Sequence, residues 1–221
     1  MSVSEVTVIG IGPGDPEYIT IKARDALAGS AVVAGFTTVL SVIEQYVPHT
    51  NLLKLTYRNQ EELLLELAEH AKQGKKCVLC AWGDINFSAS ELIDRIRNKV
   101  DQLNLIPCVS SAQIAAVRSG LKMEESIFVT LHKRLDDDLE ELNRYLNEGQ
   151  RDMIVIPRPF DLMPQGIAAG LISSGQNPSR IVRVYQKLSM EDEMTWEGSL
   201  LELSEYETEF SDLSIIVIKK V

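Results

Sequence analysis

Short apolar runs alternate with amphipathic segments along the first half of the chain. Each run is a few residues long and rich in Val, Ile and Leu, which is typical of buried strands. The segments between the runs carry apolar residues at helical spacing. We therefore predict strands at residues 6–11, 31–34, 52–55, 76–82 and 103–108, and helices at residues 21–28, 40–46, 59–73 and 89–100. Alternating strands and helices predict a parallel sheet with helices on its faces.

Local signals mark the ends of two of these helices. Thr20 is a candidate N-cap of the first helix, and Gly29 stands where a C-cap glycine belongs. Asn59 is a candidate N-cap of the third helix, and Gly74 follows its last turn. These residues support the predicted helix boundaries.

The second half of the chain has a different rhythm. Its last three apolar runs follow one another without a helix-length segment between them, which predicts an antiparallel or mixed arrangement. We predict helices at residues 112–119, 136–147 and 162–173, strands at 127–131 and 153–156, and strand-like runs at 181–188, 194–203 and 213–218.

These patterns predict an α/β protein of two α/β domains joined without a flexible linker. Residues 1–109 form an N-terminal α/β domain with a mainly parallel sheet, and residues 110–221 form a C-terminal domain with a mixed sheet. A cleft between two such domains is the default ligand site.

Composition narrows the class of function. The chain has 221 residues with a formal net charge of −10, which argues against nucleic acid as a partner because phosphate contacts need a basic face. No apolar run approaches the roughly 20 residues of a membrane span, and we find no targeting signal, so we expect no membrane partner. The three cysteines are too few for a disulfide framework, which indicates a cytoplasmic protein.

A glycine-rich turn follows the first predicted strand. Gly10, Gly12 and Gly14 resemble the start of a dinucleotide-binding loop, but Asp15 stands where that motif needs its third glycine, and Pro13 interrupts it. A nicotinamide-dependent oxidoreductase is therefore disfavoured. The glycines either form a tight turn that needs positive φ or let a ligand approach the backbone closely.

Two further turns follow strands of the same predicted sheet. One covers residues 82–86 and the other residues 108–113. Because the carboxyl ends of parallel strands meet at one edge, we expect all three turns to lie together, where open α/β sheets bind ligands.

These segments carry a family resemblance. Residues 8–20 resemble the opening motif of the tetrapyrrole methylase family, the S-adenosylmethionine-dependent enzymes of corrin biosynthesis. Residues 82–84 are similar to the Gly-Asp-Pro loop of that family, and residues 109–113 to its Ser-Ser-x-Gln loop. The resemblance covers almost the whole chain. It implies an enzyme that transfers a methyl group from a sulfonium to carbon, with the cofactor in the cleft between the two domains.

Weaker signals suggest one branch of the family. Residues 131–134 are similar to a Leu-His-Gly-Arg segment of the methyltransferases that act on C5 of cobalt-precorrin-7 or the related precorrin-6Y, and residues 186–198 also fit. Methylation of another tetrapyrrole carbon stays open. Ile85 replaces the usual proline and Lys133 the usual glycine. The first departure leaves open a cofactor-sensing subunit without activity, and the second affects substrate detail.

The resemblance also implies site residues and partners. It implies a corrin-pathway tetrapyrrole as substrate, a homodimer, and a separate protein for C15 methylation and decarboxylation, because the chain stops at Val221. Asp84 is open to two interpretations, a turn carboxylate that caps backbone N–H groups or a contact to the cofactor. The residues implied around S-adenosylmethionine, or its product S-adenosylhomocysteine, are Pro13, Asp84, Phe87, Ser110, Ser111, Pro157, Tyr185 and Leu213.

Basic residues near strand ends are candidates to receive the acidic arms of such a substrate, which a chain of this net charge would otherwise repel. They are Arg118, His132, Lys133, Arg134 and Arg158. His132 is also the one candidate catalytic residue, with a polar strand end as the alternative.

No metal site is expected. Cys77 and Cys80 have C-x-x-C spacing, but residues three apart in a strand face opposite sides of the sheet.

Overall fold

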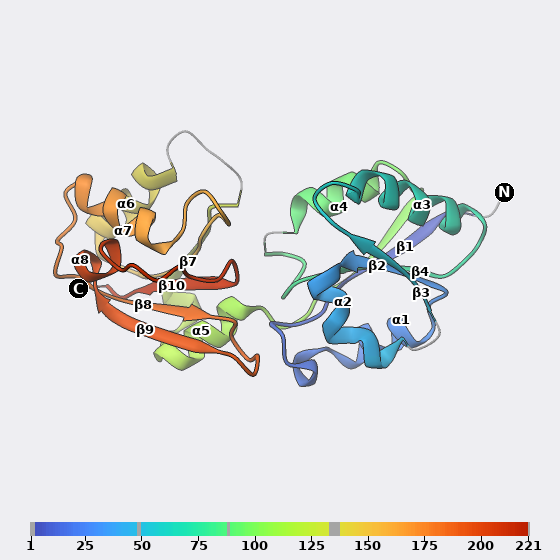
Figure 1. The fold of residues 1–221 in the computed structure, drawn as a ribbon, viewed down its shortest axis with the longest axis horizontal. Coiled ribbons are helices and arrows are strands. Elements are labelled where there is room, and N and C mark those ends of the chain that lie inside the picture. The colour runs from blue at the N-terminus through green and yellow to red at the C-terminus, as the bar shows by residue number, and fades with distance from the viewer. Residues whose placement is uncertain (1–2, 48–49, 88, 133–137, 221) are drawn as a thin grey trace. The chain divides into compact units, whose positions relative to one another are not determined.

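The computed structural model describes residues 3–47, 50–87, 89–132 and 138–220 (Figure 1). By its internal packing the chain divides into two compact units, Met1–Ser110 and Ser111–Val221. No helix in the described part of the chain is both long and apolar enough to cross a bilayer.

The first unit is a parallel α/β sheet. Its strand order is β3-β2-β4-β1-β5, and every neighbouring pair is parallel. The strands are β1 (Glu5–Gly10), β2 (Val32–Phe36), β3 (Asn51–Leu55), β4 (Cys77–Ala81) and β5 (Gln102–Ile106). The helices are α1 (Ile21–Ala28), α2 (Thr37–Ile43), α3 (Gln60–Lys72) and α4 (Ser90–Arg97), with short 3₁₀ turns η1 (Pro16–Tyr18) and η2 (Glu44–Tyr46).

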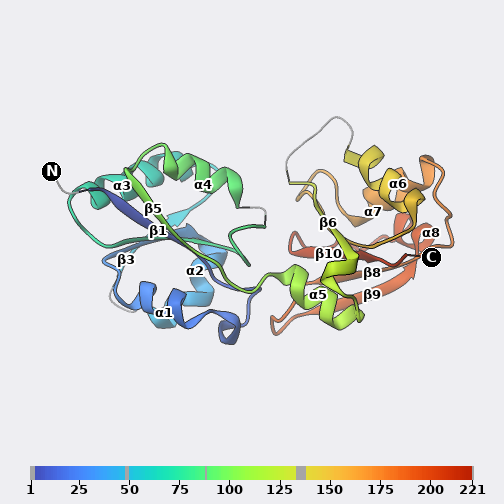
Figure 2. The same ribbon diagram turned by 180° about the vertical axis from the view of Figure 1, so that it is seen from behind.

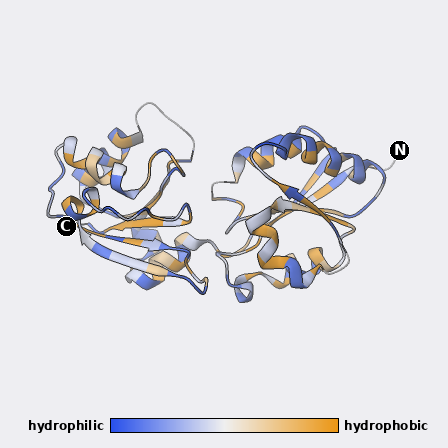
Figure 3. Cartoon of the chain, in the orientation of Figure 1, coloured by the Kyte–Doolittle hydropathy of each residue, from blue (hydrophilic) through white to orange (hydrophobic). Residues whose placement is uncertain are grey.

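Helices cover both faces of this sheet. Leu67 of α3 and Ile96 of α4 belong to one buried cluster, and Leu27 of α1 and Ile43 of α2 belong to a second. The two pairs of helices lie on opposite sides of the strands in both views (Figures 1 and 2). Hydrophilic residues dominate the outward sides of α3 and α4 (Figure 3). Amphipathic helices on both faces explain why the central strands are apolar almost throughout.

The two strand cysteines illustrate this two-sided burial. Cys77 lies in the cluster under α3 and α4, and Cys80 in the cluster under α1 and α2. Both are free thiols. Burial raises the pKa of Cys77 to about 11 and that of Cys80 further still. The two sulfurs therefore face opposite sides of the sheet, as the strand period predicts.

The second unit is built on a mixed sheet of order β6-β7-β10-β8-β9. Only β6 and β7 pair in parallel, and the other neighbours are antiparallel. The strands are β6 (Ser126–Thr130), β7 (Asp152–Ile156), β8 (Ile181–Gln186), β9 (Met194–Ser199) and β10 (Ser214–Ile218). The helices are α5 (Ser111–Ser119), α6 (Asp138–Glu148), α7 (Pro164–Ser173) and α8 (Leu200–Ser204), with a 3₁₀ turn η3 (Met123–Glu125).

The helices of this unit divide between the two faces of its sheet. Leu142 of α6, Leu171 of α7 and Leu203 of α8 share one buried cluster with the sheet, whereas α5 lies on the other side (Figures 1 and 2). The predicted fold class, two α/β domains with a parallel first sheet and a mixed second one, is therefore confirmed.

Two local predictions were wrong. The run at 194–203 is not one strand, because β9 ends at Ser199 and α8 begins at the next residue. Ser199 and Glu202 form a capping box, in which Glu202 N donates to Ser199 Oγ (3.2 Å) and Ser199 N donates to Glu202 Oε2 (2.7 Å). The second error concerns Asn59, whose side chain accepts from Thr56 N (2.6 Å) instead of from the helix that follows. Thr20, by contrast, caps α1 as predicted.

The carboxyl end of β1 is packed too closely for a side chain. A Cβ on Gly10 would lie 2.4 Å from the carbonyl oxygen of Gly83 and 2.8 Å from Cβ of Cys108. Both neighbours belong to the connections that leave β4 and β5, so neither can move without displacing a loop.

We therefore expect Gly10→Ala to lower the free energy of unfolding by about 1–3 kcal/mol, the usual cost of overpacking. Gly29→Ala is the matched control, since its new Cβ would meet nothing closer than Asp25 O at 3.5 Å. The measurement is urea unfolding followed by tryptophan fluorescence. Equal midpoints for the two variants would show that the loops at Gly10 yield without cost.

Candidate functional site

Three connections meet at the carboxyl edge of the parallel sheet. They follow β1, β4 and β5, which are neighbours with β1 in the middle. The first two are tied directly, because Gly12 N donates to Gly83 O (3.1 Å) and Gly83 N donates to Gly12 O (2.9 Å). Gly12 has a φ of +80° and Gly83 a φ of +60°, so this pairing requires glycine at both positions.

Asp84 ties the second connection to the third. Its carboxylate is buried, with 4% of the residue exposed. Oδ2 accepts from Cys108 N (2.6 Å), and Oδ1 accepts from Asn86 N (2.9 Å) and Asn86 Nδ2 (2.8 Å). The structure thus shows the capping role that the sequence left open. A contact between Asp84 and a cofactor stays a prediction.

The other predicted residues of the first unit line the same loops. Phe87 is half-buried and its N–H donates to Asp84 O (3.0 Å), while Pro13 and Ser110 are buried. Ile85, which replaces the expected proline, is 5% exposed and belongs to the buried cluster that the sheet shares with α3 and α4. An apolar anchor beneath the loop explains how the Asp84 turn is held without proline.

Charge in these loops has one sign. Residues 10–15, 82–87 and 108–111 contain two carboxylates, Asp15 and Asp84, and no lysine, arginine or histidine. These loops attract a ligand that carries positive charge and give a phosphate no cationic partner. S-Adenosylmethionine, with its sulfonium and ammonium groups, fits this set of groups, whereas a dinucleotide does not.

A second group of predicted residues gathers at one edge of the mixed sheet. Thr130 of β6 pairs in register with Ile156 of β7, so His132 and Arg158 follow neighbouring parallel strands. Pro157 directly follows β7, and Leu213 directly precedes β10, which runs antiparallel to β7. The register alone therefore brings these residues to the same edge.

Arg158 links two connections at this edge through hydrogen bonds. Its Nη1 donates to Leu131 O (2.9 Å), and its Nε donates to Asp161 Oδ2 (2.9 Å). His132 shares a hydrogen bond of 3.0 Å between Nδ1 and Thr130 Oγ1. His132 keeps part of its surface open to solvent, while burial of the remainder and, second, the charge of Arg158 lower its pKa. The imidazole is thus held in its neutral form near pH 7.

The remaining predicted residues are placed differently. Tyr185 is buried, and its hydroxyl bonds with Ser119 Oγ (2.9 Å) and accepts from Arg183 Nη1 (3.3 Å), which ties β8 to α5. Arg118 of α5 is paired with Glu193 in the connection from β8 to β9 instead of joining His132. Ser111 is the first residue of α5. Lys133 and Arg134 lie outside the described residues.

Two residues that bond to Asp84 were not predicted from the sequence. Asn86 and the backbone of Cys108 complete the hydrogen bonds of Asp84. The spacing of Asp84 and Asn86 is a local signal for an Asx turn and could have been read from the sequence. Cys108 gives no such signal, because only the neighbouring positions of β1, β4 and β5 bring it there.

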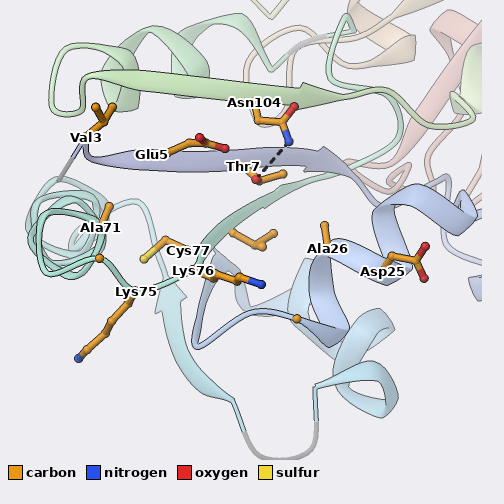
Figure 4. Close-up of a pocket in the computed structure, with 13 residues that line it drawn as sticks. Val3, Glu5, Thr7, Asp25, Ala26, Ala71, Lys75, Lys76, Cys77 and Asn104 are labelled. Carbon is orange, nitrogen blue, oxygen red and sulfur yellow. Dashed lines mark hydrogen bonds between the residues drawn. The ribbon is translucent and has the colours of Figure 1, made fainter.

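A separate cavity of about 450 Å³ lies at the opposite, amino edge of the parallel sheet (Figure 4). Glu5, Thr7, Lys76 and Asn104 line it, and Asn104 Nδ2 donates to Thr7 Oγ1 (3.4 Å). It contains none of the predicted site residues, so we do not take it as the candidate site.

Comparison with known proteins identifies the family of this chain. The model of a family described as Tetrapyrrole (Corrin/Porphyrin) Methylases matches residues 5–204. The chain is 30% identical over 217 residues to a probable cobalt-precorrin-7 C(5)-methyltransferase of Methanocaldococcus jannaschii, covering 96% of each protein. It is 28% identical to a cobalt-precorrin-4 C(11)-methyltransferase of the same organism, covering 91% of this chain and 81% of the relative.

Solved structures share the fold. A precorrin-6Y methylase of Archaeoglobus fulgidus superposes with a TM-score of 0.71 at 18% identity, covering 99% of each chain. A uroporphyrin-III C-methyltransferase of Thermus thermophilus, solved with S-adenosylhomocysteine, gives a TM-score of 0.72 at 21% identity, covering 97% of this chain and 92% of that one. The resemblance identified in the sequence is confirmed: the chain belongs to the tetrapyrrole methylase family and is an S-adenosylmethionine-dependent methyltransferase.

Proposed function

We propose that the protein is a C-methyltransferase of cobalamin biosynthesis that methylates C5 of cobalt-precorrin-7 or of the related precorrin-6Y. One observation carries this proposal: the 30% identity to the C(5)-methyltransferase extends over 96% of both proteins. The relative named for C11 is 28% identical over less of each chain, so methylation of another tetrapyrrole carbon is the second candidate. The family resemblance further supports a homodimer.

The three loops of the first unit are proposed to hold the cofactor. When bound, S-adenosylmethionine supplies a methyl group that its positive sulfonium makes electrophilic. The loops contribute backbone groups at Pro13, Phe87 and Ser110 and the negative charge of Asp15 and Asp84, with no opposing cation. None of these residues is needed as a nucleophile, because methyl transfer in line depends on position and orientation.

The edge formed by His132 and Arg158 is proposed to meet the substrate. Corrin-pathway tetrapyrroles carry ionised acetate and propionate arms, which a chain at −10 repels overall. Arg158 offers a cation with low exposure that is already oriented by Leu131 O and Asp161. His132 is the proposed proton acceptor at the methylated carbon, since its lowered pKa keeps the imidazole neutral.

The reaction itself provides the first test. Purified protein with S-adenosylmethionine carrying a ¹³C methyl group and cobalt-precorrin-7 is expected to yield one labelled methyl at C5, detected by NMR, together with S-adenosylhomocysteine. A panel of other corrin intermediates is the control. A label on a different carbon would assign the second candidate, and absence of turnover on every intermediate would contradict both.

Asp84 is tested by substitution. We expect Asp84→Ala to weaken S-adenosylhomocysteine binding about tenfold, because Cys108 N–H loses its acceptor and the loops lose their common brace. The same loss lowers unfolding free energy by about 1–3 kcal/mol. Asp94→Asn, at an exposed carboxylate of α4 paired with Arg97, is the control. Unchanged affinity in the folded fraction, measured by calorimetry, would make Asp84 a structural cap only.

Arg158 is tested through two independent readouts. In Arg158→Gln the pKa of His132 rises toward its ordinary value, because a nearby positive charge is removed, and NMR titration of the imidazole protons measures this shift. Tetrapyrrole binding weakens by about 1–3 kcal/mol while S-adenosylhomocysteine binding is retained. The control is Arg144→Gln, at an exposed residue of α6. A shifted pKa with unchanged tetrapyrrole affinity would place the acidic arms elsewhere.

A further inference from the structure

The carboxyl edge of the parallel sheet continues past the three loops to the ends of β2 and β3. The strand order places β2 beside β4, and β3 beside β2. Neighbouring strands lie about 4.8 Å apart, so the ends of β2 and β3 are roughly 5 and 10 Å from the end of β4, where the Asp84 turn begins. A ligand that overhangs the proposed cofactor loops on this side therefore meets the residues at the ends of β2 and β3.

Two aromatic rings meet at these strand ends. Phe36 is the last residue of β2 and pairs in register with Leu55, the last residue of β3. The ring centroids of Phe36 and Tyr57 are 5.3 Å apart, with 49° between the ring planes. Phe36 packs against both buried clusters of the unit, whereas Tyr57 is 72% exposed. One ring of the pair is thus anchored in the core, and the other is open to solvent.

The turn that carries Tyr57 is held by hydrogen bonds. Asn59 Oδ1 accepts from Thr56 N (2.6 Å) and Thr56 Oγ1 (2.9 Å), and Asn59 Nδ2 donates to Lys54 O (3.2 Å). Arg58 N donates to Thr56 Oγ1 (3.3 Å). Tyr57 and Arg58 therefore project from a backbone that is ordered before a ligand binds.

Arg58 gives this turn a positive charge that no carboxylate neutralises by direct contact. Residues 56–60 contain Arg58 and no acidic residue. In the first turn of α3, Glu61 is paired with Lys99, and Glu62 forms no ion pair with Arg58. Among the residues that the structure describes, the Arg58 guanidinium has no ion-pair partner at all. It is consequently available to a carboxylate of a ligand, which it can bind through two parallel hydrogen bonds.

These groups fit one of the two ligands of the proposed reaction. An open aromatic face beside an arginine suits a ligand that combines a conjugated surface with carboxylates. The acceptor carbon of the tetrapyrrole must reach the methyl group of the cofactor, so the macrocycle, which is wider than one strand spacing, has to cover part of this edge. The cofactor has a net positive charge and is attracted instead by the carboxylates of the three loops.

We propose that Tyr57 and Arg58 are substrate-binding residues. The exposed ring of Tyr57, backed by Phe36, packs against the conjugated face of the tetrapyrrole, and Arg58 binds one of its carboxylates. This inference rests on the proposed function and deepens it. Neither residue takes part in the chemical step. Together they limit how the macrocycle lies over the cofactor loops, and therefore which carbon faces the methyl group.

Binding of uroporphyrin III, a stable tetrapyrrole polycarboxylate, tests both residues. We expect its Kd, measured by porphyrin fluorescence, to rise about fivefold in Tyr57→Ala, which loses the ring contact, and about tenfold in Arg58→Gln, which loses the cation. The Kd of S-adenosylhomocysteine, measured by calorimetry, stays unchanged in both variants. Arg58→Gln also reduces the salt dependence of uroporphyrin III binding, which a merely structural role would not do.

Two variants serve as matched controls. Tyr57→Phe keeps the ring and is expected to bind uroporphyrin III as the wild type does. Arg24→Gln removes an exposed arginine of α1, which also has no ion-pair partner among the described residues, and leaves the Kd and its salt dependence unchanged. With cobalt-precorrin-7 as substrate, Tyr57→Ala and Arg58→Gln raise KM for the tetrapyrrole, whereas the two controls do not.

The outcomes distinguish the two proposals. Wild-type protein that binds neither uroporphyrin III nor cobalt-precorrin-7 would overturn the proposed function and this inference with it. Wild-type Kd and KM values in both Tyr57→Ala and Arg58→Gln would overturn this inference alone. Weaker binding of S-adenosylhomocysteine with unchanged uroporphyrin III affinity would also overturn it and assign the turn to the cofactor. A changed oligomeric state in sedimentation, with unchanged uroporphyrin III affinity, would assign the turn to a contact between protein chains instead.

Discussion

The buried carboxylate of Asp84 is the interaction on which the candidate cofactor site depends. Its two oxygens receive N–H groups from its own turn and from the connection after β5. The Gly12–Gly83 pair attaches the connection after β1 to the same assembly. A carboxylate removed from water needs such donors, and the N–H groups of Asn86 and Cys108 need an acceptor, so the same hydrogen bonds satisfy both. The loops are consequently preorganised before any ligand arrives.

The two candidate sites, one in each unit, differ in their charged groups. The three loops at the carboxyl edge of the first sheet carry Asp15 and Asp84 and no cation, whereas the edge after β6 and β7 in the second unit carries His132 and an Arg158–Asp161 ion pair, with an exposed aromatic ring at Phe160. A methyl donor with a sulfonium is cationic, and a tetrapyrrole acceptor with ionised arms is anionic. In the proposed function, the cofactor is attracted by the first set of groups and the substrate by the second.

The charge that a ligand meets at each candidate site is set by the nearby residues and not by the net charge of the chain. The chain has 32 acidic and 22 basic residues, and some of its exposed carboxylates are paired with lysine or arginine, such as Glu61 with Lys99 and Arg95. Such surface pairs are screened and contribute little to stability. Arg158 is also paired, with Asp161, but its side chain is only 15% exposed, so this interaction is screened less by water than the pairs on the helices are.

The sequence by itself determined the strand and helix rhythm, the caps at Thr20 and Gly29, the opposite facing of Cys77 and Cys80, and the family, since each depends on residues close together in the chain or on a motif. Tertiary structure alone decided which loops meet. Asp84 and Cys108 are 24 positions apart, and only the order β4-β1-β5 brings them into contact. It also decided that Asn59 bonds backward to Thr56, and that Phe160 takes a left-handed backbone, because a bridge from Arg158 to Leu162 closes the turn around it. A polar side chain selects its partner from everything that packing places within reach, and a linear pattern contains only its neighbours.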